Sequence, residues 1–103
     1  LGWFTWLDHA LSAGIDLPRL PGLPSVAETV ERWEAATGRS AEHHRWAEIF
    51  AGFGFAVVMV RLTDLLKGFA VFPEDSDFAE TNPGCVALRR ALADLDVHPE
   101  DLP

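Results

Sequence analysis

The amino-acid sequence predicts an all-α fold of about four helices. Three observations predict it. Apolar residues recur at helical spacing along most of the chain, capping residues or Gly and Pro bound these stretches, and no stretch shows the sustained alternation of a confident strand. The chain has 103 residues, of which 49% are apolar and 23% charged. This composition is that of a globular protein, and the length allows one domain or less.

The first predicted helix covers residues 3–12 and is amphipathic. Its apolar face carries Trp3, Phe4, Trp6, Leu7, Ala10 and Leu11, and its polar face carries Thr5, Asp8, His9 and Ser12. We expect Gly14 to end this helix. Three prolines exclude a helix in the next segment, so residues 15–24 are predicted to form a stiff loop.

The second predicted helix begins with a capping box, because Ser25 stands three residues before Glu28. It is expected to run to about Thr37, where Gly38 ends it. The residues expected to face inward are Val26, Val30 and Trp33.

The longest predicted helix covers residues 41–67 and stops at Gly68. Its first turns are amphipathic, and the residues expected to face outward are Glu42, His43, Arg45 and Glu48. No side chain between Ile49 and Val60 is charged or hydrogen-bonding. A helix that is apolar all round must be buried all round, so we expect Val57→Asp to be severely destabilising.

Two glycines in this helix, Gly52 and Gly54, each cost about 1 kcal/mol against Ala. They indicate close approach of a neighbouring element. The β-branched residues at positions 57, 58 and 60 leave a strand conceivable, but the length of the stretch and its flanking residues favour a helix.

The last part of the chain combines an acidic segment with a final helix. Residues 69–81 contain four acids and Pro73, which indicates a surface loop. Asn82-Pro83 predicts a helix start, and the helix is expected to run to about Asp94. Its inward residues are expected to be Cys85, Leu88, Leu92 and Leu95. The domain organisation predicted is therefore a helical unit over residues 1–95 and a polar tail over 96–103.

The predicted helices expose more apolar surface than they can cover. Three short helices, each about 10 to 12 Å across, cover only part of the long helix. The first helix also offers a wider apolar face than one partner would bury. We therefore expect the surplus to be covered by more of the same chain, by a second subunit or by a ligand. The start at Leu1 rather than Met agrees with a truncated chain.

The charge and the cysteine count limit the classes of partner. The net charge is −8 and the basic residues are scattered, which argues against nucleic acid and against an anionic membrane surface. The longest apolar run, from Ala51 to Val60, is about half of the ~20 residues that a membrane span needs. The single cysteine excludes an internal disulfide and favours a reducing, cytoplasmic location.

No recognisable catalytic constellation is present in the sequence, so no catalytic, cofactor-binding or metal residue is assigned. For several residues the sequence allows either a functional role or a purely structural one. His44 and Glu48 have metal-ligand spacing but are favoured as solvated surface residues. Cys85 near a helix start is favoured as a small buried residue over a nucleophile. Trp3 and Trp6 are candidates to line an acceptor pocket, with core packing as the favoured alternative.

Two further sequence patterns resemble ligand-binding motifs but lack residues that those motifs need. Gly52-Phe53-Gly54 lacks the third glycine and the preceding strand of a phosphate-binding run. The segment with Asp75 and Asp77 lacks the glycine and the distal Glu of a calcium loop.

Three stretches within about residues 1–66 carry a resemblance to a known family. They are Leu1-Gly2-Trp3; Pro21-Gly22-Leu23-Pro24-Ser25 with Val30-Glu31-Arg32-Trp33-Glu34 and Thr37-Gly38-Arg39; and Trp46-Ala47-Glu48-Ile49-Phe50 leading to Ala56-Val57-Val58-Met59. They resemble the end of the aminoglycoside-phosphotransferase and choline-kinase-like superfamily, especially bacterial members similar to the kinase-like part of acyl-CoA dehydrogenase family 10 and 11 proteins. The second stretch is the most specific. Trp33 and Trp46 depart from the family pattern, in which tyrosine is common.

The resemblance implies the helical C-terminal lobe of a protein-kinase-like fold, with ATP and magnesium and phosphoryl transfer to a small hydroxyl compound. In that family the catalytic and metal-binding residues precede the stretch that Leu1-Gly2-Trp3 resembles, so none maps onto this chain. The partners implied are an upstream kinase lobe and a small-molecule substrate, and we expect the chain alone to self-associate. Two alternatives remain: a non-enzymatic helical interaction or dimerisation module, and an inactive relative of the kinases.

Overall fold

The structure is a computed structural model that describes residues 1–95; the predicted polar tail, residues 96–103, lies outside the described residues. The described chain is all-α, as predicted, with five α-helices, one short 3₁₀ helix and no strand in that range. The elements in chain order are α1 (Gly2–Ser12), η1 (Ala13–Ile15), α2 (Val26–Thr37), α3 (His44–Gly68), α4 (Phe78–Thr81) and α5 (Pro83–Ala93).

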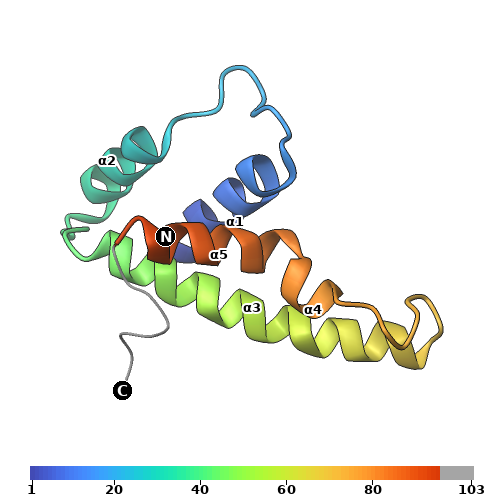
Figure 1. Ribbon diagram of the computed structural model, residues 1–103. Helices are drawn as coiled ribbons and strands as arrows, with labels where there is room; N and C mark the ends of the chain where they lie inside the picture. Colours follow the sequence, from blue (N-terminus) through green and yellow to red (C-terminus); the bar gives the residue numbers. More distant parts are fainter. Residues whose placement is uncertain (96–103) are drawn as a thin grey trace.

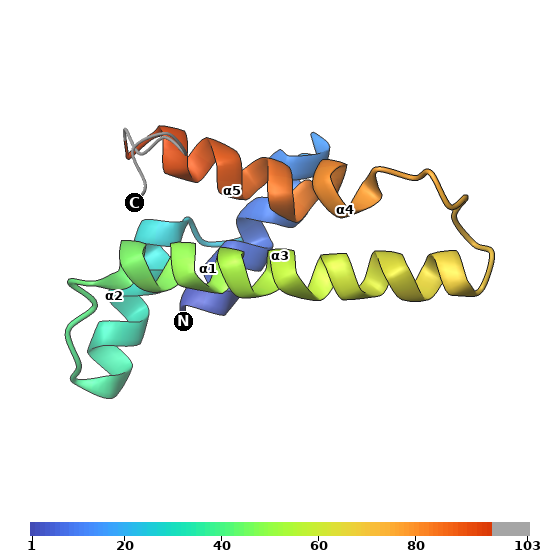
Figure 2. The ribbon, with the colours of Figure 1, turned by 60° about the horizontal axis from the view of Figure 1, so that its bottom comes forward.

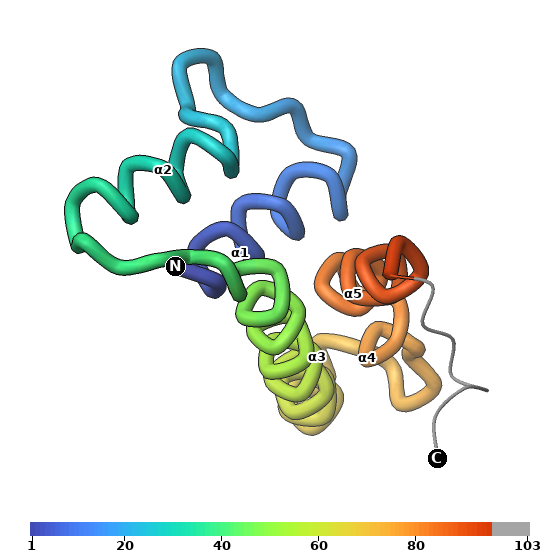
Figure 3. The backbone as a smooth tube through the Cα atoms, turned by 90° about the vertical axis from the view of Figure 1, so that its left-hand side faces the viewer, coloured from blue at the N-terminus to red at the C-terminus, as the bar shows by residue number. Residues whose placement is uncertain are grey.

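The long helix α3 is the element on which the others are arranged (Figure 1). α1 and α5 both pack along its first half, and α3 then continues beyond them to the turn that leads back to α4 (Figure 2). α2 stands away from α5, at the far end of the loop that follows α1 (Figure 3). The radius of gyration is 15.8 Å, against about 13 Å for a compact chain of this length. The helices are therefore less compactly arranged than in a typical globular domain of this length.

The core lies where α1, α3 and α5 meet, and it is built mostly from small side chains. Its buried members are Trp6, Ala10, Ala51, Ala87 and Ala91, with Ile49, Phe55 and Leu88 packed around them. Gly52 and Gly84 let the helices approach closely, because a Cβ at either position would collide with the ring of Trp6 or Phe55. The predicted close approach at Gly52 is confirmed, and its partner is an aromatic ring of α1.

The local start and stop signals of two helices are confirmed. The Ser25 hydroxyl accepts from the Glu28 N–H at 3.1 Å, and the Glu28 carboxylate accepts from the Ser25 N–H at 2.7 Å. Gly38 ends α2 in the left-handed region with φ 67°. Asn82 caps α5 by accepting from the Cys85 N–H at 3.0 Å, and Pro83 occupies the first turn.

The predicted end of the first helix at residue 12 is confirmed, but the expectation that Gly14 is its stop signal is wrong. α1 ends at Ser12, and the chain continues as the 3₁₀ helix η1 through Gly14. The left-handed residue that turns the chain is Asp16, with φ 54°. Gly14 lies instead against the backbone of Pro83, so its small size serves the contact between η1 and α5.

The prediction that α3 is buried all round is wrong. Its buried residues are Glu48, Ala51, Gly52, Met59 and Thr63. Many of its other apolar positions, including Val57 at 50% exposure, are exposed to solvent. The physical reason is that α1 and α5 both lie on one side of α3, so the opposite side has no cover among the described residues.

Two polar residues predicted to face outward are buried. Glu48 is 6% exposed and accepts a hydrogen bond from Arg45 Nη1 at 2.8 Å. Thr5 is 1% exposed; its hydroxyl bonds back to the Gly2 carbonyl oxygen at 3.3 Å. Each polar group finds a local partner, which offsets the cost of its burial.

The inward faces predicted for α2 and α5 also need correction. No residue of α2 is fully buried, and Trp33 is only half-buried. In α5 the small residues Gly84, Ala87 and Ala91 meet the core, while Leu95 is exposed. Small residues face inward because α5 lies close to α1 and α3.

The acidic segment 69–81 is not loop throughout, since α4 occupies its last turn.

Candidate functional site

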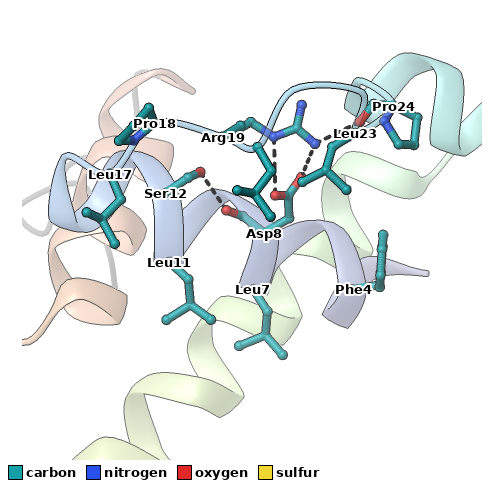
Figure 4. A pocket seen from close by; sticks show the side chains of 11 residues that line it. Phe4, Leu7, Asp8, Leu11, Ser12, Leu17, Pro18, Arg19, Leu23 and Pro24 are labelled. Atoms are coloured by element: carbon teal, nitrogen blue, oxygen red, sulfur yellow. Dashed lines mark hydrogen bonds and ion pairs between the residues drawn. The ribbon is translucent and has the colours of Figure 1, made fainter.

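The candidate site is a groove of about 500 Å³ on the outer side of α1, which we call the α1 groove (Figure 4). One wall comes from α1 and the other from the proline-containing loop that follows it. The lining residues are Phe4, Leu7, Asp8, Leu11, Ser12, Leu17, Pro18, Arg19, Leu20, Leu23 and Pro24. The lining is therefore apolar apart from three residues.

An ion pair holds the two walls of the α1 groove together. Arg19 donates from Nε to Asp8 Oδ1 at 3.2 Å and from Nη2 to Asp8 Oδ2 at 2.7 Å. Arg19 Nη2 also donates to the Pro24 carbonyl oxygen at 2.7 Å. One guanidinium thus links α1, the middle of the loop and the residue just before the α2 cap. Bidentate pairs of arginine with a carboxylate fix the relative orientation of the two side chains and also stabilise the contact.

The side chains of the α1 groove are suited to binding a ligand and not to catalysing a reaction. The charges of Asp8 and Arg19 compensate each other. The Ser12 hydroxyl donates to the Asp8 carbonyl oxygen at 2.6 Å and so is already engaged. What remains is apolar surface from Phe4, Leu7 and the loop leucines, suited to an apolar side of a ligand or of another protein segment.

Two smaller features accompany it. A groove of about 490 Å³ lies between α3 and α5, where Trp46 and Phe50 stack with ring centroids 5.3 Å apart. A groove of about 270 Å³ near the start of α1 is lined partly by Trp33, His43 and His44. Neither groove contains a nucleophile paired with a base.

The two tryptophans predicted to line an acceptor pocket lie in different environments. Trp6 is 1% exposed and belongs to the core, so it has no surface to offer a ligand. Its indole Nε1 is buried without a hydrogen-bond partner. Trp3 is 48% exposed and rests on Gly54 of α3. Neither residue lines the α1 groove, and only Trp3 remains available to a ligand.

The His44–Glu48 pair is not arranged as an open metal site. His44 Nε2 lies 3.1 Å from Thr5 Oγ1, within hydrogen-bonding distance, and Glu48 is engaged by Arg45. His43 pairs instead with Glu42 at 3.1 Å. Over residues 1–95 no group of three or more His, Cys, Asp or Glu side chains could hold a metal ion.

Cys85 lies half-buried in the first turn of α5. Asn82 Nδ2 donates to its sulfur at 3.2 Å, and the thiol donates to the Ala79 carbonyl oxygen at 3.3 Å. The side chain therefore joins α4 to α5. This contact agrees with the structural role favoured for this residue.

The two remaining sequence patterns have structural surroundings that differ from those of a ligand site. Gly52-Phe53-Gly54 lies inside α3, so its backbone N–H groups belong to the helix and do not form a loop. Asp77 precedes α4, and its carboxylate accepts from the Thr81 hydroxyl at 3.3 Å.

The residues that sequence reasoning missed are Asp8 and Arg19. They stand 11 positions apart, and no local spacing rule pairs them. The signal that could have found them is weak: one acid on the first helix and one base between the prolines of the loop. Their contact depends on the path of the loop, which turns back over α1 (Figure 4).

The exposed apolar surface of α3 is also relevant to whether the chain contacts a membrane. By length and composition α3 could cross a membrane, and 22% of its most apolar window is buried.

Comparison with protein-family models, with curated proteins and with solved structures found no match to this chain. The predictions that no membrane, nucleic acid or cofactor is bound stay predictions.

Proposed function

We propose that this chain is the helical C-terminal part of a small-molecule phosphotransferase, in which the α1 groove walls one side of the acceptor pocket. The observation that carries the proposal is the construction of that groove. Leu1-Gly2-Trp3 leads directly into its α1 wall, and Pro21–Ser25 contributes Leu23 and Pro24 to its loop wall. One stretch on which the family resemblance rests therefore contributes to the loop side of this apolar surface, and another directly precedes its α1 side.

The role proposed for this part is positioning. Phosphoryl transfer is catalysed mainly by holding the acceptor in line and by stabilising charge around metal-bound phosphates. A wall of Phe4, Leu7 and Leu11 would orient the apolar side of an acceptor and exclude water from it. Trp3, half-exposed at the start of α1, lies outside that wall and against Gly54 of α3.

ATP and magnesium are assigned to another lobe of the same protein. The described residues do not fit them: the Gly52-Phe53-Gly54 backbone is helical, and residues 1–95 offer no cluster of oxygen ligands for a divalent ion. No step through nucleotide or metal is therefore derived for this chain.

The test starts from the DNA directly upstream of the Leu1 codon. We expect an open reading frame with a His-Gly-Asp-type loop and a metal-binding aspartate. The joined polypeptide should transfer phosphate from ATP to a small hydroxyl compound. Leu7→Asp in the α1 groove should raise KM for the acceptor more than it lowers kcat. Leu65→Asp, on an exposed position of α3 away from this groove, is the matched control and should leave both constants near those of the parent.

Two outcomes would contradict the proposal. An upstream lobe without the aspartates would make the protein an inactive relative. A start codon at this point would favour a non-enzymatic interaction module. The observation that favours the second alternative is the exposure of Phe4 and Leu11 on α1 and of Phe50 and Phe53 on α3, because exposed apolar residues that gather on one surface mark interaction sites.

A further inference from the structure

One exposed side of α3 carries apolar residues in a regular repeat. Five of them follow one another at alternating spacings of four and three residues, and we call them the α3 seam: Trp46, Phe50, Phe53, Val57 and Val60. Each is between 44% and 67% exposed. This spacing is the heptad repeat by which helices pair along a shared apolar stripe.

The α3 seam lies on the side of α3 away from its buried residues, and Trp46, Phe50 and Phe53 also line the groove between α3 and α5. At about 100° per residue, its five positions fall within a sector of about 80°. The buried residues of α3 are centred roughly 150° away, on the side where α1 and α5 pack. The seam is thus separate from the core, and it is also separate from the α1 groove, none of whose lining residues lies on α3.

Polar residues limit the α3 seam at both ends. The next heptad position before Trp46 is His43, which pairs with Glu42. The next position after Val60 is Asp64. The one charged residue between Trp46 and Val60 is Glu48, which is buried among the core-facing residues of α3 and paired with Arg45. The apolar stripe is therefore about 21 Å long, at 1.5 Å per residue.

We propose that the α3 seam binds the same seam of a second copy of this chain, with the two α3 helices antiparallel. The order of side-chain sizes argues for this orientation. A two-fold axis at Phe53 places Trp46 opposite Val60 and brings Phe50 near Val57. On both sides of the central pair of Phe53 residues, large residues then face small ones, which is the pattern that fills an interface without voids. A parallel pair would set Trp46 against Trp46 and leave the valine end loosely filled.

The area available agrees with a dimer. Aromatic side chains bury 150 to 250 Å² each, so the exposed part of the seam offers about 500 Å² per copy. Two copies would bury about 1,000 Å², the lower limit for a specific interface. Leu88 and Leu92 line the groove beside Phe53 and extend the apolar surface toward α5. Each copy has net charge −8, so the dimer should tighten as salt screens the repulsion.

The first experiment is sedimentation equilibrium of the 103-residue chain at two salt concentrations. We expect a dimer whose dissociation constant falls at higher salt. Phe53→Glu should raise that constant at least ~100-fold, with helical circular dichroism unchanged because Phe53 is exposed. Phe4→Glu, on the equally exposed wall of the α1 groove, is the matched control and should leave the constant within about twofold. Val57→Ser is a second seam variant in case Phe53→Glu fails to fold.

The second experiment reads the orientation by disulfide formation in a Cys85→Ser background. A mixture of Trp46→Cys and Val60→Cys chains should form the mixed disulfide, while Trp46→Cys alone should not cross-link to itself. A monomeric parent chain at ~100 µM would overturn the proposal. So would loss of the dimer in Phe4→Glu but not in Phe53→Glu, self-cross-linking of Trp46→Cys, or a monomer that binds phosphatidylcholine vesicles through the seam. None of these results depends on phosphotransfer, so the proposed function stands or fails separately.

Discussion

The indole ring of Trp6 lies directly against the backbone of Gly52, so that a Cβ added at Gly52 would stand 2.7 Å from Cζ2 of the ring. This contact joins α1 to α3 at the centre of the core. Trp6 is the largest fully buried side chain of the described residues. The absence of a side chain at Gly52 is what allows a helix carrying so large a residue to lie close to α3.

Gly52→Ala should therefore destabilise the fold. Overpacking of this kind costs about 1 to 3 kcal/mol, which outweighs the ~1 kcal/mol gained in helix propensity. Gly54→Ala is the matched control: its Cβ would meet Trp3 at 3.2 Å, and the Trp3 side chain is half-exposed and can shift. Thermal unfolding followed by circular dichroism should show a lower midpoint for the first variant only. Equal midpoints would mean that the close approach is not essential.

A second prediction separates the two sides of α3. Ala51 is 2% exposed, so Ala51→Asp buries an unpaired carboxylate at a cost of several kcal/mol. Val57→Asp, expected from the sequence to be severe, should instead cost under about 1 kcal/mol in the monomer because half of Val57 is in solvent. Urea unfolding of both variants at a concentration where the chain is monomeric measures the difference. A severe effect at Val57 would show that this side of α3 is covered.

The capping box of α2 predicts a pH dependence. The N–H and hydroxyl of Ser25, with Arg32 and Arg19 contributing, hold the pKa of Glu28 below its ordinary value. A carboxylate whose pKa is lower in the folded state stabilises that state above the unfolded pKa, and the effect is lost as pH falls through the folded pKa. Amide exchange in the first turn of α2 should therefore show more opening, relative to the intrinsic rates, under acidic conditions. Glu28→Ala should remove this response, whereas Glu31→Ala, on the same exposed helix, should keep it.

Removal of the Asp8–Arg19 pair should loosen the loop of the α1 groove more than it destabilises the fold. Both partners are partly exposed, so Arg19→Met should lower global stability by only about 1 kcal/mol. Limited proteolysis within residues 17–24 should be faster in Arg19→Met. Arg19→Lys should resemble it, since an ammonium group cannot make the same two-pronged contact. Arg39→Met, at an arginine with no ion-pair partner among residues 1–95, is the control.

The isolated chain should neither bind nucleotide nor transfer phosphate. The expectation follows from the lack of any phosphate-binding loop or metal-ligand cluster in the described residues. Isothermal calorimetry with ATP and magnesium is the direct measurement. Saturable binding would mean that this part carries a nucleotide site of its own.

Residues that act within one helical turn were predictable from the sequence alone. Ser25 and Glu28 form their reciprocal bonds across three residues, and Asn82 caps α5 across the same distance. Gly38 ends α2 because glycine adopts a positive φ at little cost. These contacts depend on neighbouring residues and on no other element, so the all-α class and most helix boundaries could be read from the sequence.

Which side of each helix is covered was decided only by the tertiary structure. Glu48 is buried and Val57 is half in solvent, although hydrophobicity alone predicts the reverse. The reason is the direction from which α1 and α5 approach, which depends on small residues such as Gly52 and Ala87 that admit a close partner. The contact of Arg19 with Asp8 likewise needs the folded path of the chain over the 11 positions that separate the two residues. Burial and long-range pairing are properties of the assembled elements, because each depends on surfaces far apart in the sequence.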